Sequence, residues 1–299
     1  KPASQLAPSR TAGEYTGTKL KFYWTAGDKL FLNDGTDLQQ SVRDNLGTQL
    51  VGSVTKVPTA SFWFAGTFSN LNYPLRYTGK NGAKDKVTIA ATQTQTLPAD
   101  ASHIGESGDC GTALATRTGA GKYGFTLTHR SAYLCFLPRT TNVTETGWVL
   151  TAVKVTSDNN IAGNYTLTTT GLTGTGSSNE ITLNTGNFDI SNAATSLATN
   201  GAYMVIAPGV HTLTVEYTVK NTNTGNTGTI VKHLDSKDYK ANTLYPLTAH
   251  LFSEYSNTKY YLWDAQEDMW HNKTPANYSE GLYTAADVPA SNLPGYASY

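Results

Sequence analysis

The stretch GAYMVIAPGVHTLTVEYTVKN, residues 201–221, carries the clearest indication of the fold. Val, Ile, Thr and Tyr dominate it, and these residue types favour the pleated, half-buried surface of a β-sheet. Pro208 and Gly209 divide the stretch in two, and this pair is typical of a turn. The stretch therefore predicts two consecutive strands on either side of that turn.

Strand-like runs of the same kind recur along the chain from Leu20 to residue 252, and turn signals separate them every 10–15 residues or so. Few amphipathic helices are predicted, and this pattern is typical of β-sandwiches. PRTTNVTETG, residues 138–147, is the natural seam between two halves of similar size. We therefore expect an all-β protein of two tandem β-sandwich domains, residues 1–146 and 147–299, the second with a tail from about residue 256.

The charge balance excludes several classes of partner. Lys plus Arg and Asp plus Glu both number 22, so the formal net charge is zero, and only 15% of residues are charged. Without a basic block the chain has no electrostatic footprint for nucleic acid or for anionic lipid. No apolar run reaches the length of a spanning helix. Polar, uncharged residues are abundant, as is common outside the cell. The chain begins KPASQLAPSR without Met, which we interpret as a trimmed form whose export signal or lipid-anchor cysteine lies upstream.

Cys110 and Cys135 are the two cysteines, and their spacing is not a zinc pattern. Two interpretations stay open. A disulfide between neighbouring strands would add about 3 kcal/mol in the chain-entropy model. Alternatively, both are buried thiols, because free cysteine packs as a small hydrophobe.

KYYLWDAQEDMWHN, residues 259–272, is the strongest candidate for chemistry. As a helix it would place Asp264, Glu267, Asp268 and His271 on one face. The strand alternative is equally open. A catalytic carboxylate pair normally sits in a cleft between elements, and these acids have no partner elsewhere. We therefore predict no catalytic, metal or cofactor-binding residue.

The aromatic residues of this stretch have two further interpretations. In the favoured one, they pin the tail onto the second sandwich. In the other, Tyr261, Trp263 and Trp270 stack on a glycan or on a partner subunit. Two other segments have structural interpretations. We expect TQTQTLPADASHIGESGD, residues 92–109, to be an extended surface connection, and His129 to be a hydrogen-bonded strand residue in or near the core.

An ordered series of stretches resembles one family. WTAGDKLFLNDG, VTIAATQTQTLPADASHI, GFTLTHRSAYLCFLP, LTAVKVTSDNNIAGNYTL and YKANTLYPLTAHL follow one another between residues 18 and 252. In this order they are similar to the strands of the Bacteroidetes fimbrillins, the type V pilins and related surface adhesins. The tail, residues 273–299, departs from a stalk subunit that would stop soon after its last strand.

The resemblance implies two transthyretin-like β-sandwich domains. It also implies a non-catalytic pilus (fimbrial) subunit or fimbria-associated adhesin, a secreted lipoprotein of the Gram-negative cell surface and outer membrane. Its partners would be other pilin subunits or further copies of itself, and a surface glycan or protein. A protease would cut after a basic residue and remove an N-terminal strand, and a strand from the next subunit would then be added.

Two arginines are candidates for the cut. Arg10 lies before any predicted strand, and Arg43 follows the first strand pair. We favour Arg43, where a cut would release residues 19–32. A surface carbohydrate-binding module is the alternative function, and a glycoside-processing enzyme is a more distant one.

Overall fold

The computed structural model describes residues 12–15, 20–140, 146–191, 194–252, 260–264, 269–273 and 281–283. Strands dominate these residues, and the helices among them are single turns. They are α1 (Leu46–Gln49), α2 (Ile104–Ser107) and α3 (Leu197–Asn200). The predicted all-β class is confirmed. No helix in the described part of the chain has the length and apolar character needed to cross a membrane.

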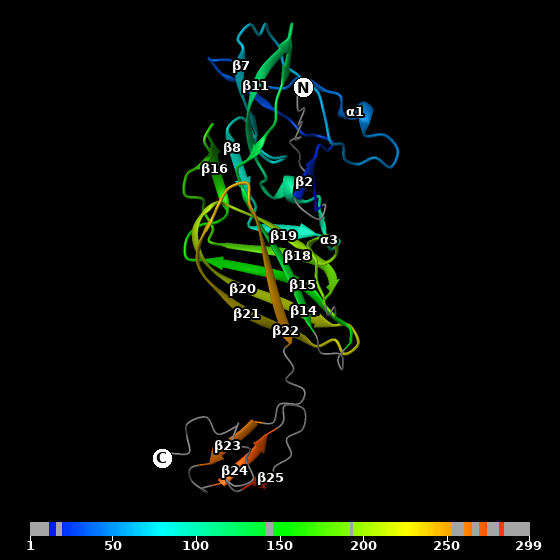
Figure 1. Cartoon of the computed structure of the whole chain (residues 1–299), viewed down its shortest axis with the longest axis vertical. Helices are drawn as coiled ribbons and strands as arrows, with labels where there is room; N and C mark the ends of the chain where they lie inside the picture. Colours follow the sequence, from blue (N-terminus) through cyan, green and yellow to red (C-terminus); the bar gives the residue numbers. More distant parts are fainter. Residues whose placement is uncertain are drawn as a thin grey trace, which may run out of the picture.

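The upper part of the molecule in Figure 1 contains a six-stranded sheet in the order β12-β11-β7-β3-β4, with β13 also pairing with β11. The strands are β3 (Phe31–Asn33), β4 (Leu38–Gln40), β7 (Asn72–Tyr77), β11 (Gly111–Gly119), β12 (Lys122–Gly124) and β13 (Thr128–His129). A separate core fills this part, and Trp24, Leu30 and Tyr77 are among its fully buried members.

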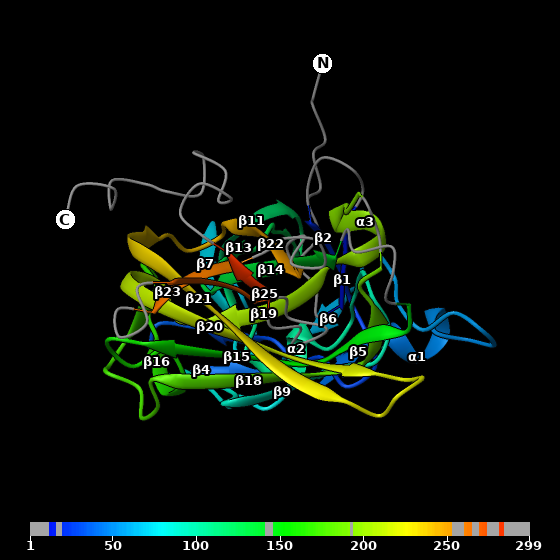
Figure 2. The same ribbon diagram turned by 90° about the horizontal axis from the view of Figure 1, so that it is seen from below.

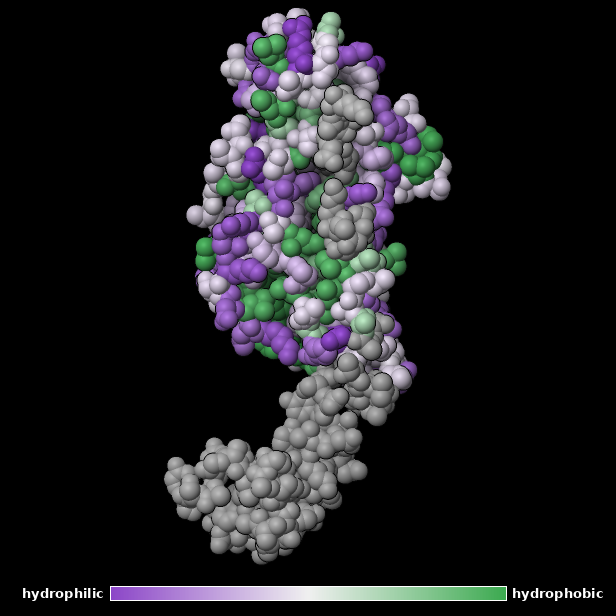
Figure 3. All heavy atoms as spheres, in the orientation of Figure 1, coloured by the Kyte–Doolittle hydropathy of each residue, from purple (hydrophilic) through white to green (hydrophobic). Residues whose placement is uncertain are grey.

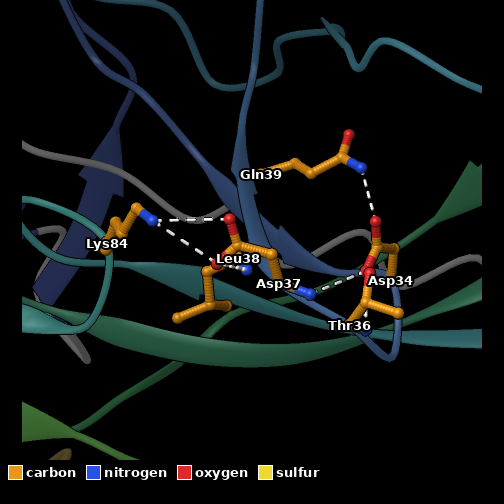
Figure 4. Close-up of polar contacts among 6 residues, drawn as sticks. All are labelled: Asp34, Thr36, Asp37, Leu38, Gln39 and Lys84. Carbon is orange, nitrogen blue, oxygen red and sulfur yellow. Dashed lines mark hydrogen bonds and ion pairs between the residues drawn. The ribbon is translucent and has the colours of Figure 1, made fainter.

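The turn between β3 and β4 is fixed by its own side chains (Figure 4). The Asp34 carboxylate accepts hydrogen bonds from the Asp37 N–H at 2.9 Å and the Thr36 N–H at 2.8 Å. These bonds hold the pKa of the Asp34 carboxyl well below its usual range, because they favour the charged form. Lys84 lies 3.4 Å from Asp37 and joins the turn to the loop that follows β7.

Two sheets face each other below the six-stranded sheet, in the middle of Figure 1, and this region is called the lower part. A five-stranded sheet has the order β21-β20-β15-β18-β9, and a three-stranded sheet has the order β19-β14-β22. Figure 2 shows them as two layers, and the largest core cluster lies between them. The strands are β9 (Thr92–Gln95), β14 (Ala132–Thr140), β15 (Trp148–Ser157), β18 (Glu180–Asp189), β19 (Ala202–Ile206), β20 (Gly209–Asn221), β21 (Thr227–Tyr239) and β22 (Leu244–Phe252).

The remaining strands form smaller sheets. One has the order β10-β1-β2, another β17-β16-β8, a third β23-β24-β25, and β5 pairs with β6. Their bounds are β1 (Ala12–Tyr15), β2 (Leu20–Tyr23), β5 (Arg43–Asp44), β6 (Phe62–Trp63), β8 (Lys86–Ile89), β10 (Asp100–Ala101), β16 (Gly163–Leu167), β17 (Leu172–Thr173), β23 (Tyr260–Asp264), β24 (Met269–Lys273) and β25 (Gly281–Tyr283).

The two strands predicted within residues 201–221 are confirmed as β19 and β20. Every residue of β19 is buried, whereas burial in β20 alternates along much of its length. Gly209 begins β20 with φ +152°. At this φ a side chain is disfavoured, so glycine suits the change of direction after Pro208.

Strand pairing crosses the seam at residues 138–147. Strands β8, β9 and β14 precede this seam or run into it, yet they pair with β16, β18, β19 and β22, which follow it. The division into residues 1–146 and 147–299 therefore stays a prediction from the sequence.

Candidate assembly surface at the sheet edges

The sheet β19-β14-β22 lies at the centre of the lower part. Strand β14 is buried on both faces, because the five-stranded sheet covers one face and the N-terminal strands cover the other. It pairs antiparallel with β19 and parallel with β22. The sheet therefore has two edges, one on β19 and one on β22, and their chemistry differs.

The outer edge of β19 has a partner for every peptide group that points away from β14. The Gln95 amide accepts from Tyr203 N–H at 2.7 Å and donates to Gly201 O at 2.9 Å. The Gln93 amide accepts from Val205 N–H at 2.9 Å and donates to Val205 O at 2.7 Å. His103 Nε2 lies 2.9 Å from Tyr203 O, where the ring nitrogen is the donor.

The same edge continues past the end of β19. Ala207 N–H donates to Ile161 O at 2.9 Å, and His211 Nε2 lies 3.2 Å from Ala207 O. The N–H and C=O groups of residues 203, 205 and 207, together with the Gly201 carbonyl, therefore all have partners. A buried peptide group without a partner is costly, so this pairing stabilises the edge.

Burial along β9 alternates, which explains how the glutamines reach β19. Thr92 and Thr94 are exposed, while Gln93 and Gln95 are each only 2% exposed. Strand β9 pairs in parallel with β18 in the opposite sheet. Successive side chains of a strand point to opposite faces, so both glutamines point into the sandwich. The expectation that residues 92–109 form a surface connection is wrong here, because these side chains are interior.

Strand β22 presents a different edge. Among the strands that the structure describes, β22 pairs with β14 alone. Tyr133 N–H donates to Thr243 O at 3.0 Å, so alternation directs the peptide groups of Pro246, Thr248 and His250 away from β14. These three residues are exposed. Pro246 has no N–H to offer, which is typical of a strand at the edge of a sheet.

The edge of the opposite sheet at β21 is blunted by charge. Exposed residues of β21 include Lys232, Asp235, Lys237 and Asp238. The register with β20 also shifts between His211 and Leu213, as at a β-bulge. Charges and bulges both disfavour edge-to-edge pairing.

The N-terminal strands cover the outer face of the β14 sheet. Phe22 of β2 belongs to a core cluster with Tyr133, Cys135 and Tyr203. Its ring stacks on His129 with centroids 3.7 Å apart, and it is 7% exposed. Removing β2 would therefore uncover apolar side chains of β14 and β19.

A buried carboxylate lies beneath this contact. Asp109 Oδ1 lies 2.8 Å from His129 Nδ1 and accepts from the Tyr133 hydroxyl at 2.5 Å. His129 is 5% exposed and lies on β13, which confirms the predicted hydrogen-bonded core histidine. The cluster links β13 and β14 beneath Phe22, and its burial favours a structural role.

The favoured cut site, Arg43, lies in β5 and is exposed. It pairs with Trp63 of β6, and its guanidinium carbon lies 4.4 Å from the centre of the Trp63 ring. Arg10 lies outside the described residues. Whether either bond is cut stays a prediction.

In the structure Cys110 and Cys135 are both free and buried, as in the interpretation of two buried thiols, and they form no disulfide. They belong to different core clusters, Cys110 between the two lower sheets and Cys135 under Phe22. Burial raises the pKa of each thiol to about 12.

The aromatic stretch forms strands where it is described. Tyr261 and Trp263 lie on β23, Trp270 lies on β24, and Trp263 is opposite Trp270 in the register. Asp264 and His271 also lie on these strands, so the helical alternative does not hold for them. Glu267, Asp268 and most of the tail from residue 256 lie outside the described residues. The glycan or partner contact stays a prediction.

Sequence reasoning missed Gln93, Gln95 and His103. The available signal was the alternation Thr-Gln-Thr-Gln, which places two amides on one face of a strand. It could not identify the partner, because residue 205 is far along the chain. In the described part of the chain, no three His, Cys, Asp or Glu residues gather as metal ligands.

Comparison with known proteins gives similarity in structure only. No protein-family model matches the chain, and no curated protein does. One similar structure is a "putative cell adhesion protein" from Bacteroides ovatus, 13% identical with a TM-score of 0.45, covering 78% of this chain and 86% of that one. Proteins with the same description from Bacteroides uniformis and Bacteroides fragilis are 16% and 13% identical, with TM-scores of 0.43 and 0.41. They cover 76% and 84% of this chain and 88% of each of those chains.

Proposed function

We propose that this chain is a non-catalytic cell-surface protein that works in adhesion and assembles by accepting an extended segment from another copy. It is a pilus subunit or a fimbria-associated adhesin, held at the outer membrane of a Gram-negative bacterium by a lipid anchor upstream of this sequence. The observation that carries the proposal is the contrast between the two edges of one sheet. The β19 edge is fully paired, whereas β22 pairs with β14 alone among the described strands.

An edge strand offers a row of unpaired N–H and C=O groups, and an extended peptide can satisfy them. Backbone pairing gives affinity, and alternate side chains give specificity. Figure 3 shows hydrophobic atoms gathered in the middle of the view, over the region where Figure 1 draws β22. A segment added there would bury apolar surface as well as form hydrogen bonds.

Proteolytic maturation after Arg43 is the second element of the proposal. Arg43 is exposed, and a cut there would separate β1 to β4 covalently from the rest of the chain. Phe22, Trp24 and Leu30 are buried, so the released segment would stay bound until a competing strand displaces it. Its departure would uncover the outer face of the β14 sheet, against which Leu244 of β22 also packs, so a segment accepted at the β22 edge could cover that face as well.

Brief trypsin treatment tests this proposal. We expect one early cut after Arg43 by mass spectrometry, followed by oligomers in light scattering and filaments in electron microscopy. Arg43→Ala should remove the cut and the assembly together. Arg117→Ala is the matched control, because Arg117 is also an exposed arginine on a strand and should behave like the unaltered chain. Cutting at Arg43 without any increase in mass would contradict assembly.

Carbohydrate binding is the second candidate function. It is motivated by the register of β23 and β24, which sets Trp263 opposite Trp270. A tryptophan side chain combines a large apolar face with an N–H group, and both features suit contact with a sugar ring. Glycan-array binding that is lost in Trp263→Ala would support it, and unchanged binding would exclude this hairpin as the site.

A further inference from the structure

We propose that Gln93, Gln95 and His103 together take the place of a strand along β19, so that this edge is closed and the sheet can be extended only at β22. The closure of β19 does not depend on the proposed function, whereas the restriction to β22 rests on the proposed assembly. Hydrogen exchange tests the first part, and oligomer formation tests the second.

The chemistry of a glutamine side chain is that of a peptide group, with one carbonyl acceptor and N–H donors. Gln93 forms two hydrogen bonds with the single residue Val205, at 2.9 and 2.7 Å. A residue facing Val205 across an antiparallel ladder would exchange the same two bonds. The Gln93 amide therefore reproduces the contact that an added strand would make.

Gln95 and His103 extend this imitation to the next outward residue. Gln95 accepts from Tyr203 N–H, and His103 Nε2 donates to Tyr203 O. The Gln95 amide also donates to Leu97 O at 2.8 Å, which holds the side chain in place. Three side chains thus pair all four outward N–H and C=O groups of Tyr203 and Val205.

A competing strand would have to displace these side chains before it could pair. Gln93 and Gln95 are 2% exposed, so their amides would then lie buried without partners. Strand β9 also lies alongside, because its residues carry the glutamines and its backbone pairs with β18. Strand β22 has no such side chains across its outward groups in the part of the chain that the structure describes.

Hydrogen exchange tests the closure directly. The double variant Gln93→Leu/Gln95→Leu keeps the size of both side chains and removes the amides. We expect the Tyr203 and Val205 N–H groups to exchange at least about tenfold faster, because their acceptors are gone. Thr92→Val/Thr94→Val is the matched control, since these positions are on the exposed face of the same strand. It should leave exchange at residues 203 and 205 unchanged.

The single variant Gln93→Leu covers the case in which the double variant unfolds. It should accelerate exchange at Val205 and leave Tyr203 protected, because only Val205 uses the Gln93 amide. Unchanged exchange at Val205 in this variant would overturn the closure. So would equal acceleration throughout the chain in a variant that is still folded, because that would show global loosening instead of an opened edge.

A proline at position 248 tests the restriction to β22. Thr248→Pro removes an outward N–H and should leave the pairing with β14 intact, as the native Pro246 does. In the Arg43-cut protein we expect at least about tenfold less oligomer than with Thr248→Val, since a strand can no longer pair there. Assembly of Thr248→Pro at the control level would overturn β22 as the accepting edge. If the unaltered cut protein does not assemble, the proposed function is wrong, and so is the restriction to β22. The hydrogen-exchange result still tests whether the β19 edge is closed.

Discussion

The Gln93 side chain and the Val205 peptide group, 112 residues apart in the chain, exchange two hydrogen bonds at 2.7 and 2.9 Å. This pairing ties β9 of the five-stranded sheet to β19 of the three-stranded sheet. It closes one side of the sandwich with side chains where a further strand would otherwise lie. The opposite side of the three-stranded sheet ends at β22, which pairs with β14 alone among the described strands.

Phe22→Ala should loosen the N-terminal cover. The ring is 7% exposed and stacks on His129 at 3.7 Å, so its removal leaves a cavity over β14. We expect a loss of about 3–5 kcal/mol in the free energy of unfolding, measured with urea. Lys21→Ala, at the exposed neighbouring position, should change it by less than about 0.5 kcal/mol. An equal effect of the two variants would show that the Phe22 contact is unimportant.

Asp109→Ala should destabilise the junction beneath Phe22. Asp109 is fully buried and bonds to His129 and to the Tyr133 hydroxyl. Its removal leaves both donors without their acceptor, at a cost of about 3–5 kcal/mol in the free energy of unfolding. Asp85→Ala removes a carboxylate that is much less buried and should cost under about 1 kcal/mol. Calorimetry or urea unfolding would compare the two.

Both cysteines should resist thiol reagents in the folded protein. Burial raises the pKa of Cys110 and of Cys135 to about 12, so at pH 8 almost no thiolate is present and neither sulfur is accessible. A colorimetric thiol titration should count none in the native state and two after unfolding in urea without reductant. A count of none after unfolding would show a disulfide instead.

Stability should fall as the pH drops below neutrality, in part through His103. Burial lowers the pKa of His103 below the ordinary histidine value of 6.5, so the unfolded chain binds a proton more readily than the folded chain. The contribution of His103 is therefore fully present above the unfolded pKa and is lost as the pH falls through 6.5 towards the folded pKa. The measurement is the slope of unfolding free energy between pH 7 and pH 5. His103→Gln keeps a donor for Tyr203 O and should flatten that slope. An unchanged slope would assign the pH dependence to other groups, such as His211, whose pKa burial also lowers.

The local pattern of residues was sufficient for much of the fold. Alternation in β20, the Pro208–Gly209 turn and the hydrogen-bonded core position of His129 could all be predicted, because each depends on near neighbours in the chain. The strand alternative for residues 261–264, which stood open beside the helix, followed from the same alternation. The role of residues 92–109 could not be predicted, because a glutamine between threonines is equally consistent with a solvated loop.

The sequence by itself determined that this chain forms β-strands, that its basic and acidic residues balance at 22 each, and that it has two cysteines without zinc spacing. Local propensity and composition decide such properties. Only the tertiary structure decided which edges of the sheets are closed, that Cys110 and Cys135 lie in separate cores, and that Phe22 covers His129. These depend on contacts between residues more than 100 positions apart, such as Gln93 and Val205, and the register of strands from distant segments sets them. Strand propensity does not encode that register, because the same alternating pattern is compatible with many partners.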